Sequence, residues 1–272
     1  MFMNSLRWFG LSDRGRFRPQ NEDAFLGMIF NAQEAHLLGK VGGSELGEHE
    51  LVFAVSDGIG GAAAGDFASR ITVEKIKKLL PKAFQRTGGG LESGASAVLA
   101  ELYTQIHASL IYLGGSYQEC SEMGATLSLC WFTQDWLFFA HIGDSRIYHL
   151  PAAGGMKQLS HDDTYVGWMF RNRQINEREA RSHPRKNILQ RALGAGHQFV
   201  DPQVGALRIQ RGDCVLICSD GIVDGMFDAQ IEEVLRETTT AHTGLNPAET
   251  LVRTAVEQSG RDNTTAVVVA VH

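Results

Sequence analysis

Three strand-like segments follow one another closely in the middle of the chain. Residues with apolar, β-branched or aromatic side chains fill most of Thr126–Phe132, Trp136–Ile142 and Arg146–Leu150, and only three residues separate each pair. Parallel strands need a crossover connection of a dozen or more residues, so connections this short exclude a parallel arrangement. The sequence therefore predicts an antiparallel meander over Thr126–Leu150.

Other strand-like and helical segments surround this meander without regular alternation. Strand-like runs lie at 51–55, 214–218 and 265–271, and helical periodicity is found over 62–83, 95–113, 229–237 and 247–258. A doubly wound parallel sheet would need strands and helices to alternate regularly. We therefore predict a single α+β domain over residues 1–272, built in layers and without an internal linker.

The charge, the apolar segments and the cysteines indicate which partners and which cell compartment to expect. The net charge of −6 provides no general basic field for nucleic acid or an anionic membrane. The longest apolar stretch is interrupted at 133–135, which argues against a spanning helix, and the N-terminal segment lacks the pattern of a signal peptide. The chain has four cysteines, Cys120, Cys130, Cys214 and Cys218. Their spacing matches no zinc site, so we expect reduced thiols. We expect a cytoplasmic monomer.

Two nearly identical corners carry the first chemical signal. VSDGIGG at Val55–Gly61 and CSDGIVDG at Cys218–Gly225 each set an acid before a glycine at the end of an apolar run. Two more acids, Asp144 and Asp262, lie beside strand-like segments. Crowded carboxylates repel one another unless a cation lies among them, and an oxygen-only shell selects Mg²⁺ or Mn²⁺. Each Asp-Gly pair, taken alone, is better explained as a plain turn.

A charged N-terminal segment, GRFRPQNEDAF, adds an arginine next to a pair of acids. The planar guanidinium of Arg18 can grip a phosphate with two parallel hydrogen bonds. Glu22 and Asp23 can join a metal site directly or through water. The alternative interpretation is an ordinary charged surface turn.

Seven short motifs occur in one order along the chain: RPQNEDAF, VSDGIGG, GATLSL, HIGDSRIY, HPRKNILQRALG, CSDGIVDG and SGRDNTTAVVV. In this order they resemble the metal-dependent PPM (type 2C) family of serine/threonine protein phosphatases, in its bacterial stand-alone form, from Leu11 almost to the end. The resemblance implies a four-layer α-β-β-α sandwich, with two antiparallel sheets flanked by helices and a metal site at one end.

The resemblance also implies a set of metal ligands. Asp57 is implied to bridge two Mn²⁺ or Mg²⁺ ions, and Gly58 to offer its carbonyl oxygen to one of them. Asp220 and Asp262 are implied to complete the ligands of the other ion. Asp144 matches the position that helps to hold a third, weaker ion in bacterial members.

Further roles follow from the same motifs. Arg18 is implied as the phosphate clamp, and Glu22 and Asp23 as residues that hold metal-bound waters. Asn263 is expected to orient the adjacent loop or a water. Ser56 and Ser219 are expected to be turn or capping groups, because no nucleophile elbow or histidine partner accompanies them.

The implied reaction is hydrolysis of phosphoserine and phosphothreonine in proteins by direct attack of a metal-bridging water, with a cognate kinase acting in opposition. Animal members usually have a histidine where this chain has Ile59, so the general acid stays open among His161, His183 and a metal-bound water. The segment 160–183 resembles the family's flap and is also explained as a surface helix and loop. Two alternatives remain: a phosphatase of small phosphorylated molecules, and an inactive phosphoprotein-binding module.

Overall fold

The computed structural model describes residues 4–86, 94–197, 199–240 and 244–272. Its strands are β1 (Ser5–Asp13), β2 (Asp23–Phe30), β3 (Ala35–Leu37), β4 (Val41–Glu45), β5 (Glu50–Ile59), β6 (Gly124–Ala125), β7 (Leu127–Phe132), β8 (Trp136–Ile142), β9 (Arg146–Leu150), β10 (Lys157–Gln158), β11 (Leu193–Gly194), β12 (Gln203–Arg208), β13 (Cys214–Cys218) and β14 (Thr264–Val271). Its helices are α1 (Ala62–Arg86), α2 (Ala95–Ser116), a 3₁₀ turn η1 (Gln118–Cys120), α3 (Tyr165–Arg171), α4 (Glu177–Ser182), α5 (Asp220–Gly225), α6 (Asp228–Thr240) and α7 (Pro247–Gln258).

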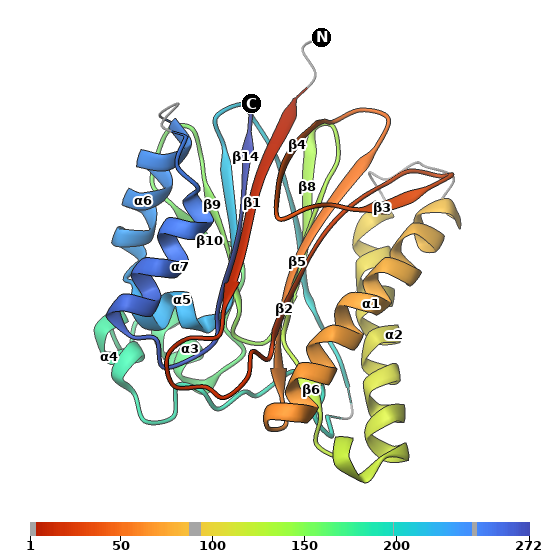
Figure 1. Ribbon diagram of the computed structural model, residues 1–272, viewed down its shortest axis with the longest axis vertical. Coiled ribbons are helices and arrows are strands. Elements are labelled where there is room, and N and C mark those ends of the chain that lie inside the picture. Colours follow the sequence, from red (N-terminus) through yellow and green to blue (C-terminus); the bar gives the residue numbers. More distant parts are fainter. Residues whose placement is uncertain (1–3, 87–93, 198, 241–243) are drawn as a thin grey trace.

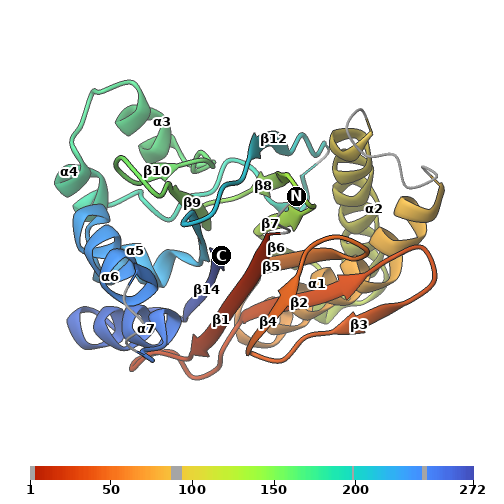
Figure 2. The same cartoon turned by 90° about the horizontal axis from the view of Figure 1, so that it is seen from above.

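Two antiparallel sheets lie face to face between two layers of helices (Figures 1 and 2). The first sheet has the order β10-β9-β13-β14-β1-β4, and the second has the order β11-β6-β5-β7-β8-β12, with β2 and β3 attached through β5. Helices α5, α6 and α7 cover the first sheet, and α1 and α2 cover the second. The predicted four-layer α+β sandwich is confirmed.

Three apolar cores fill the spaces between these four layers. One lies between α1, α2 and the second sheet, one between the sheets, and one between the first sheet and α5–α7. The central strands are therefore buried on both faces, and every residue of β7, β13 and β14 is buried. This explains why these strands are continuous apolar runs in the sequence rather than alternating ones.

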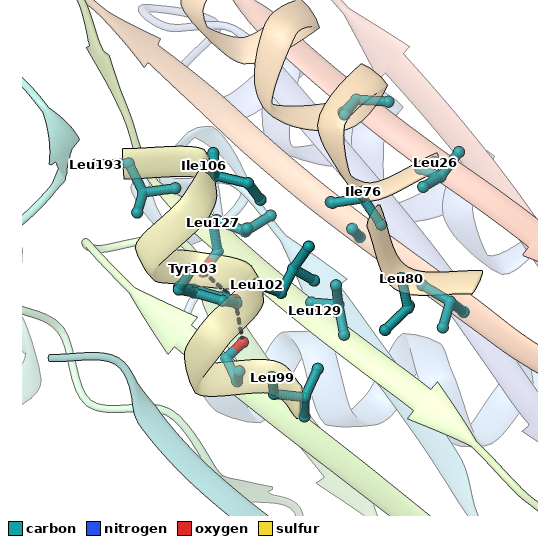
Figure 3. Close-up of a cluster of buried hydrophobic side chains, with 14 of the residues drawn as sticks. Leu26, Ile76, Leu80, Leu99, Leu102, Tyr103, Ile106, Leu127, Leu129 and Leu193 are labelled. Atoms are coloured by element: carbon teal, nitrogen blue, oxygen red, sulfur yellow. Dashed lines mark hydrogen bonds between the residues drawn. The ribbon is translucent and has the colours of Figure 1, made fainter. Parts of the chain in front are cut away.

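Figure 3 shows how the helical layer is fixed to the second sheet. Leu99, Leu102 and Ile106 of α2 lie in the same buried cluster as Ile76 of α1. The buried hydroxyl of Tyr103 lies 2.6 Å from the carbonyl oxygen of Ala140 and 3.1 Å from that of Leu127. A polar group in this core is thus satisfied by the sheet backbone, as burial requires.

The predicted meander over Thr126–Leu150 is only partly correct. Strands β7 and β8 pair as expected, but β9 pairs with β13 and β10 in the other sheet. The connection turns at Gly143, which has a φ of +108°, and a Cβ there would lie 2.6 Å from the Cβ of Thr126. A tight turn thus carries the chain from one sheet to the other and places Asp144 between them.

The other predicted helices and strands are present in the structure, which also contains strands that the sequence did not indicate. The helices expected over 62–83, 95–113, 229–237 and 247–258 are present as α1, α2, α6 and α7. Strands β1, β2, β4 and β12 were not predicted, although β1 alternates buried and exposed positions. All four cysteines are free thiols, three of them buried. Among the described helices, none is long and apolar enough to cross a membrane.

Candidate active site

The predicted acids meet at one end of the sandwich, where β5 ends, α1 begins and the β1–β2 connection crosses (Figure 1, lower end). A cavity of about 220 Å³ lies there, and we call it the acid cavity. Eight of the nine predicted site residues line it: Arg18, Glu22, Asp57, Gly58, Asp144, Asp220, Asp262 and Asn263. Six residues without a predicted role line it as well: Ile59, Gly60, Gly61, Thr126, Asn187 and Leu189.

Asp23 lies behind the acid cavity rather than in its wall. It sits directly opposite Asp57 in the ladder of β2 and β5. One carboxylate oxygen accepts hydrogen bonds from Ser219 Oγ at 2.7 Å and from Thr265 Oγ1 at 2.6 Å. The other oxygen, Oδ1, is buried without a hydrogen-bond partner, and burial raises the pKa of Asp23 to about 6. Asp23 therefore joins β2 to both β14 and the start of α5.

Asp57 lies at the centre of the negative charge. Burial, followed by the charges of Asp23 and Asp220, raises its pKa well above the ordinary value. Thr126 fixes its backbone: Asp57 N donates to Thr126 Oγ1 at 3.0 Å, and Thr126 N donates to the Asp57 carbonyl at 2.8 Å. Burial also raises the pKa of Asp144 to about 7. The carboxylates cannot easily move apart, because the segments that carry them are hydrogen-bonded in place.

The donor set fits hard divalent cations. Asp220 Oδ1 is buried without a hydrogen-bond partner, as is Asp23 Oδ1. In the described part of the chain, no three His, Cys, Asp or Glu side chains come close enough to enclose an ion by themselves. Mg²⁺ and Mn²⁺ keep several waters and accept backbone carbonyls, so widely placed carboxylates suit them. The unpartnered oxygens are what such cations would satisfy.

Arg18 pairs with one of the predicted ligands. Its Nη2 donates to Asp262 Oδ2 at 2.7 Å, and this hydrogen bond is the main cause that raises the pKa of the guanidinium. The Arg18 side chain remains 42% exposed, so part of its fork is open to the cavity mouth. Arg18 therefore lines the acid cavity with a charged, partly exposed guanidinium.

Asn263 fastens the loop that carries Arg18 and Glu22. Its Oδ1 accepts from the backbone N–H of Glu22 at 2.8 Å, and its Nδ2 donates to the carbonyls of Arg14 and Gln20 at 2.8 and 2.9 Å. This geometry favours the loop-orienting role over the water-orienting one. Burial raises the pKa of the Glu22 carboxyl.

The two Ser-Asp-Gly corners share a steric requirement. A Cβ at Gly58 would lie 1.9 Å from the carbonyl oxygen of Gly65 in α1, and one at Gly221 would lie 2.1 Å from that of Asn263. Each glycine thus lets another backbone segment pass directly beside the acid. Ser56 Oγ donates to the Thr126 carbonyl. Ser219 is the N-cap residue of α5, but its hydroxyl donates to Asp23 and makes no capping hydrogen bond. The corners lie in different sheets, in line with the absence of an internal repeat.

Known proteins share this sequence pattern and this architecture. Residues 40–256 match the family model described as Protein phosphatase 2C. The chain belongs to the protein phosphatase 2C family. The serine/threonine phosphatase stp of Listeria innocua is 32% identical over 260 residues, which cover 95% of this chain and 93% of that protein.

Two solved structures extend the likeness. The serine/threonine phosphatase of S. agalactiae superposes with a TM-score of 0.80 at 26% identity, covering 98% of this chain and all of that one. The catalytic domain of the serine/threonine protein phosphatase PstP, solved in complex with two manganese ions, superposes with a TM-score of 0.75 at 27% identity, covering 98% and 99% of the two chains. The family prediction made from the seven motifs is confirmed.

In this protein phosphatase 2C, neither candidate histidine lines the acid cavity. The ring Nδ1 of His161 lies 3.0 Å from Gln203 Nε2, and that of His183 accepts from Arg185 N at 3.1 Å. The general acid therefore remains unassigned. Asn187 and Leu189 do line the cavity and were missed, although both lie within the quoted motif HPRKNILQRALG.

The flap segment is tied to the corner that carries Asp144. Asp163 accepts from Gly143 N at 3.0 Å and from the guanidinium of Arg191, while Asp162 makes a two-pronged pair with Arg146 at 2.7 and 2.9 Å. The two acids thus have different partners and different roles. Asp163 braces the turn beside the acid cavity, and Asp162 neutralises a buried arginine of β9.

Proposed function

We propose that this protein phosphatase 2C hydrolyses phosphoserine and phosphothreonine in proteins, and that the acid cavity is where it does so. Family membership makes the chain a protein serine/threonine phosphatase. The observation that supports the acid cavity as the site is its carboxylates, which come from separate segments and include the buried, unpartnered Oδ1 of Asp220. Acids held together without partners are a binding site for cations rather than a source of stability.

We assign the cation ligands as follows. Asp57 would be shared by two Mn²⁺ or Mg²⁺ ions, with the Gly58 carbonyl as a further ligand of one, and Asp220 and Asp262 would hold the other. Asp144 would help to hold a third, weaker ion. When bound, such cations supply Lewis acidity and activate a water for attack on phosphorus.

The chain's own side chains bind and orient the phosphate. The guanidinium of Arg18 can take two phosphate oxygens in its fork, which a lysine cannot do. Asn263 and Glu22 hold the loop that aims it. No histidine is found among the described residues that line the acid cavity, so the proton for the leaving alkoxide is proposed to come from water.

We also propose that residues 1–272 form one catalytic domain that acts as a cytoplasmic monomer. The pairing of β1 with β14, which brings the two ends of the chain together, supports one domain. The net charge of −6 argues against nucleic acid and anionic membranes as partners. The proposed partners are phosphorylated proteins and the serine/threonine kinase that modifies them.

The test is phosphate release from a phosphothreonine peptide by metal-stripped protein, titrated with Mn²⁺ and Mg²⁺, with the Asp57→Asn variant alongside. We expect release only with metal, and loss of release in the variant. Faster turnover of sugar or nucleotide phosphates than of peptides would support a small-molecule phosphatase instead. Metal binding without release from any phosphate ester would support a phosphoprotein-binding module.

A further inference from the structure

An apolar groove opens on the surface where α1 begins and α2 ends. It measures about 400 Å³ and is lined by Ala63, Ala64, Phe67, Tyr117, Glu119 and Cys120. Phe67 is 40% exposed and Tyr117 57% exposed, so both rings present much of their area to solvent. Clustered apolar surface of this kind, unlike a single exposed apolar residue, indicates a contact site.

The apolar groove lies close to the acid cavity. Gly60 and Gly61 line the acid cavity, and Ala63, two residues beyond Gly61, lines the apolar groove. Two residues of extended chain span at most about 7 Å. A Cβ at Gly60 would lie 3.0 Å from the carbonyl oxygen of Glu122, so the segment just after Cys120 lies directly against Gly60. The groove therefore lies next to the acid cavity, within reach of a peptide bound there.

The size and charge of the apolar groove define its occupant. Six lining residues are far fewer than the roughly 20–30 residues on each side of a stable protein interface, so the groove by itself cannot support a second copy of the chain. Its volume suits one or two side chains. Among the described residues that line the groove, Glu119 is the only charged one, and its carboxylate disfavours an acidic occupant.

We propose that the apolar groove receives an aliphatic or aromatic side chain of the phosphoprotein substrate, two or three residues away from the phosphorylated residue. This inference rests on the proposed function and adds a sequence preference to it. The acid cavity can bind the phosphate of any phosphoserine or phosphothreonine and cannot discriminate between their sequence contexts. Burial of a neighbouring apolar side chain supplies that discrimination, of about tenfold or more in kcat/KM.

The experiment measures kcat/KM on phosphothreonine peptides in a serine-glycine background. One leucine is moved through each of the four positions on either side of the phosphothreonine. The enzymes are wild type, Phe67→Ser, Tyr117→Ser and the control Tyr112→Ser, which removes a 72% exposed ring of α2 that lies outside the groove. We expect one leucine position to raise kcat/KM about tenfold in wild type and Tyr112→Ser, and not in the two groove variants.

Hydrolysis of p-nitrophenyl phosphate separates this inference from the proposed function. This substrate has no peptide that could fill the groove, so we expect all four enzymes to hydrolyse it at the same rate. The groove proposal would be overturned if all four enzymes hydrolyse p-nitrophenyl phosphate equally and leucine has no effect in wild type. It would also be overturned if the leucine effect survives in Phe67→Ser. In both cases the proposed phosphatase function would stand. Wild type that hydrolyses neither substrate would overturn both. Self-association that only the groove variants lose, with no leucine effect, would identify a second copy as the occupant and overturn the proposal.

Discussion

The two ends of strand β5 place buried acids in opposite situations. At the first residue, Glu50 lies alone, its Oε2 accepts a hydrogen bond from Trp131 Nε1 at 3.1 Å, and burial raises its pKa to about 7. At the other end, Asp57 faces Asp23 across the ladder and lies in the field of Asp220, whose Oδ1 has no partner. The first end has one acid with a hydrogen-bond partner, and at the other end Asp23 and Asp220 each keep one oxygen without a partner.

The difference explains which buried acids signal function. A lone acid in an apolar environment can take up a proton and keep its hydrogen bond, so its burial affects only stability. Several acids fixed on separate segments lower their repulsion by protonation or by binding cations. We therefore expect the acid end of β5 to be less stable without cations than with them, as functional sites commonly are.

The largest expected difference between the two ends is in catalysis. Asp57→Asn and Asp220→Asn should each lower kcat/KM on a phosphothreonine peptide by more than about 100-fold, because loss of a metal ligand should exceed the 10–100-fold effect of outer-shell changes. Glu50→Gln, the matched change at the other end, should remain close to wild type. If Asp220→Asn kept more than a tenth of the wild-type kcat/KM, the predicted difference between the two ends of β5 would be contradicted.

A smaller difference should appear in pH dependence at the Glu50 end. The pKa of Glu50 is about 7 in the folded chain and near 4.5 when unfolded, so the folded state binds its proton more tightly. Its contribution to stability is present below about pH 4.5 and is lost as the pH rises through 7. At about pH 9, Glu50→Gln should be more stable than wild type by about 2–3 kcal/mol, as measured by urea unfolding. An equal pH dependence in both proteins would contradict this assignment.

At the acid end, removal of one charge should stabilise the metal-stripped protein. Burial and neighbouring acids raise the pKa of Asp220, which means that its charged form is unfavourable in the fold. Metal-stripped Asp220→Asn should therefore unfold at a higher urea concentration than metal-stripped wild type. Its free energy of unfolding should be higher by about 1–2 kcal/mol near pH 8. Saturating Mn²⁺ should reverse this order. Failure of the order to reverse would show that Asp220 binds no cation.

The smallest effect concerns the clamp at the mouth of the acid cavity. Arg18→Lys keeps the charge beside Asp262 but loses the two-pronged fork. We expect KM for a phosphothreonine peptide to rise about fivefold with a smaller change in kcat, since a phosphate hydrogen bond of about 1 kcal/mol is lost. A kcat loss equal to that of Asp57→Asn would instead place Arg18 among the groups that act on the reacting atoms.

The acid constellation was predictable because its residues belong to short, ordered motifs. The sandwich followed from the same resemblance, and the main helices from their periodicity. The third strand of the meander was placed in the wrong sheet because a three-residue turn looks the same whether the next strand stays in its sheet or crosses over. Gly143 was the available signal, since its positive φ makes that crossing possible.

Other parts of the site depend on contacts between distant residues, which local sequence does not encode. The ring of His161 is occupied by Gln203, 42 residues away, and no pattern near His161 indicates this. The hydrogen bond from Gly143 to Asp163 likewise joins residues 20 positions apart. The apolar groove likewise joins the start of α1 to the end of α2, so its lining becomes visible only in the fold.

A calorimetric titration of metal-stripped protein with Mn²⁺ counts the ions that the acid end of β5 binds. We expect at least two ions per chain for wild type and for Glu50→Gln, and at least one fewer for Asp57→Asn and Asp220→Asn. The same stoichiometry in Asp220→Asn and wild type, or no binding by wild type, would contradict the claim that the unpartnered acids at this end of β5 exist to hold cations.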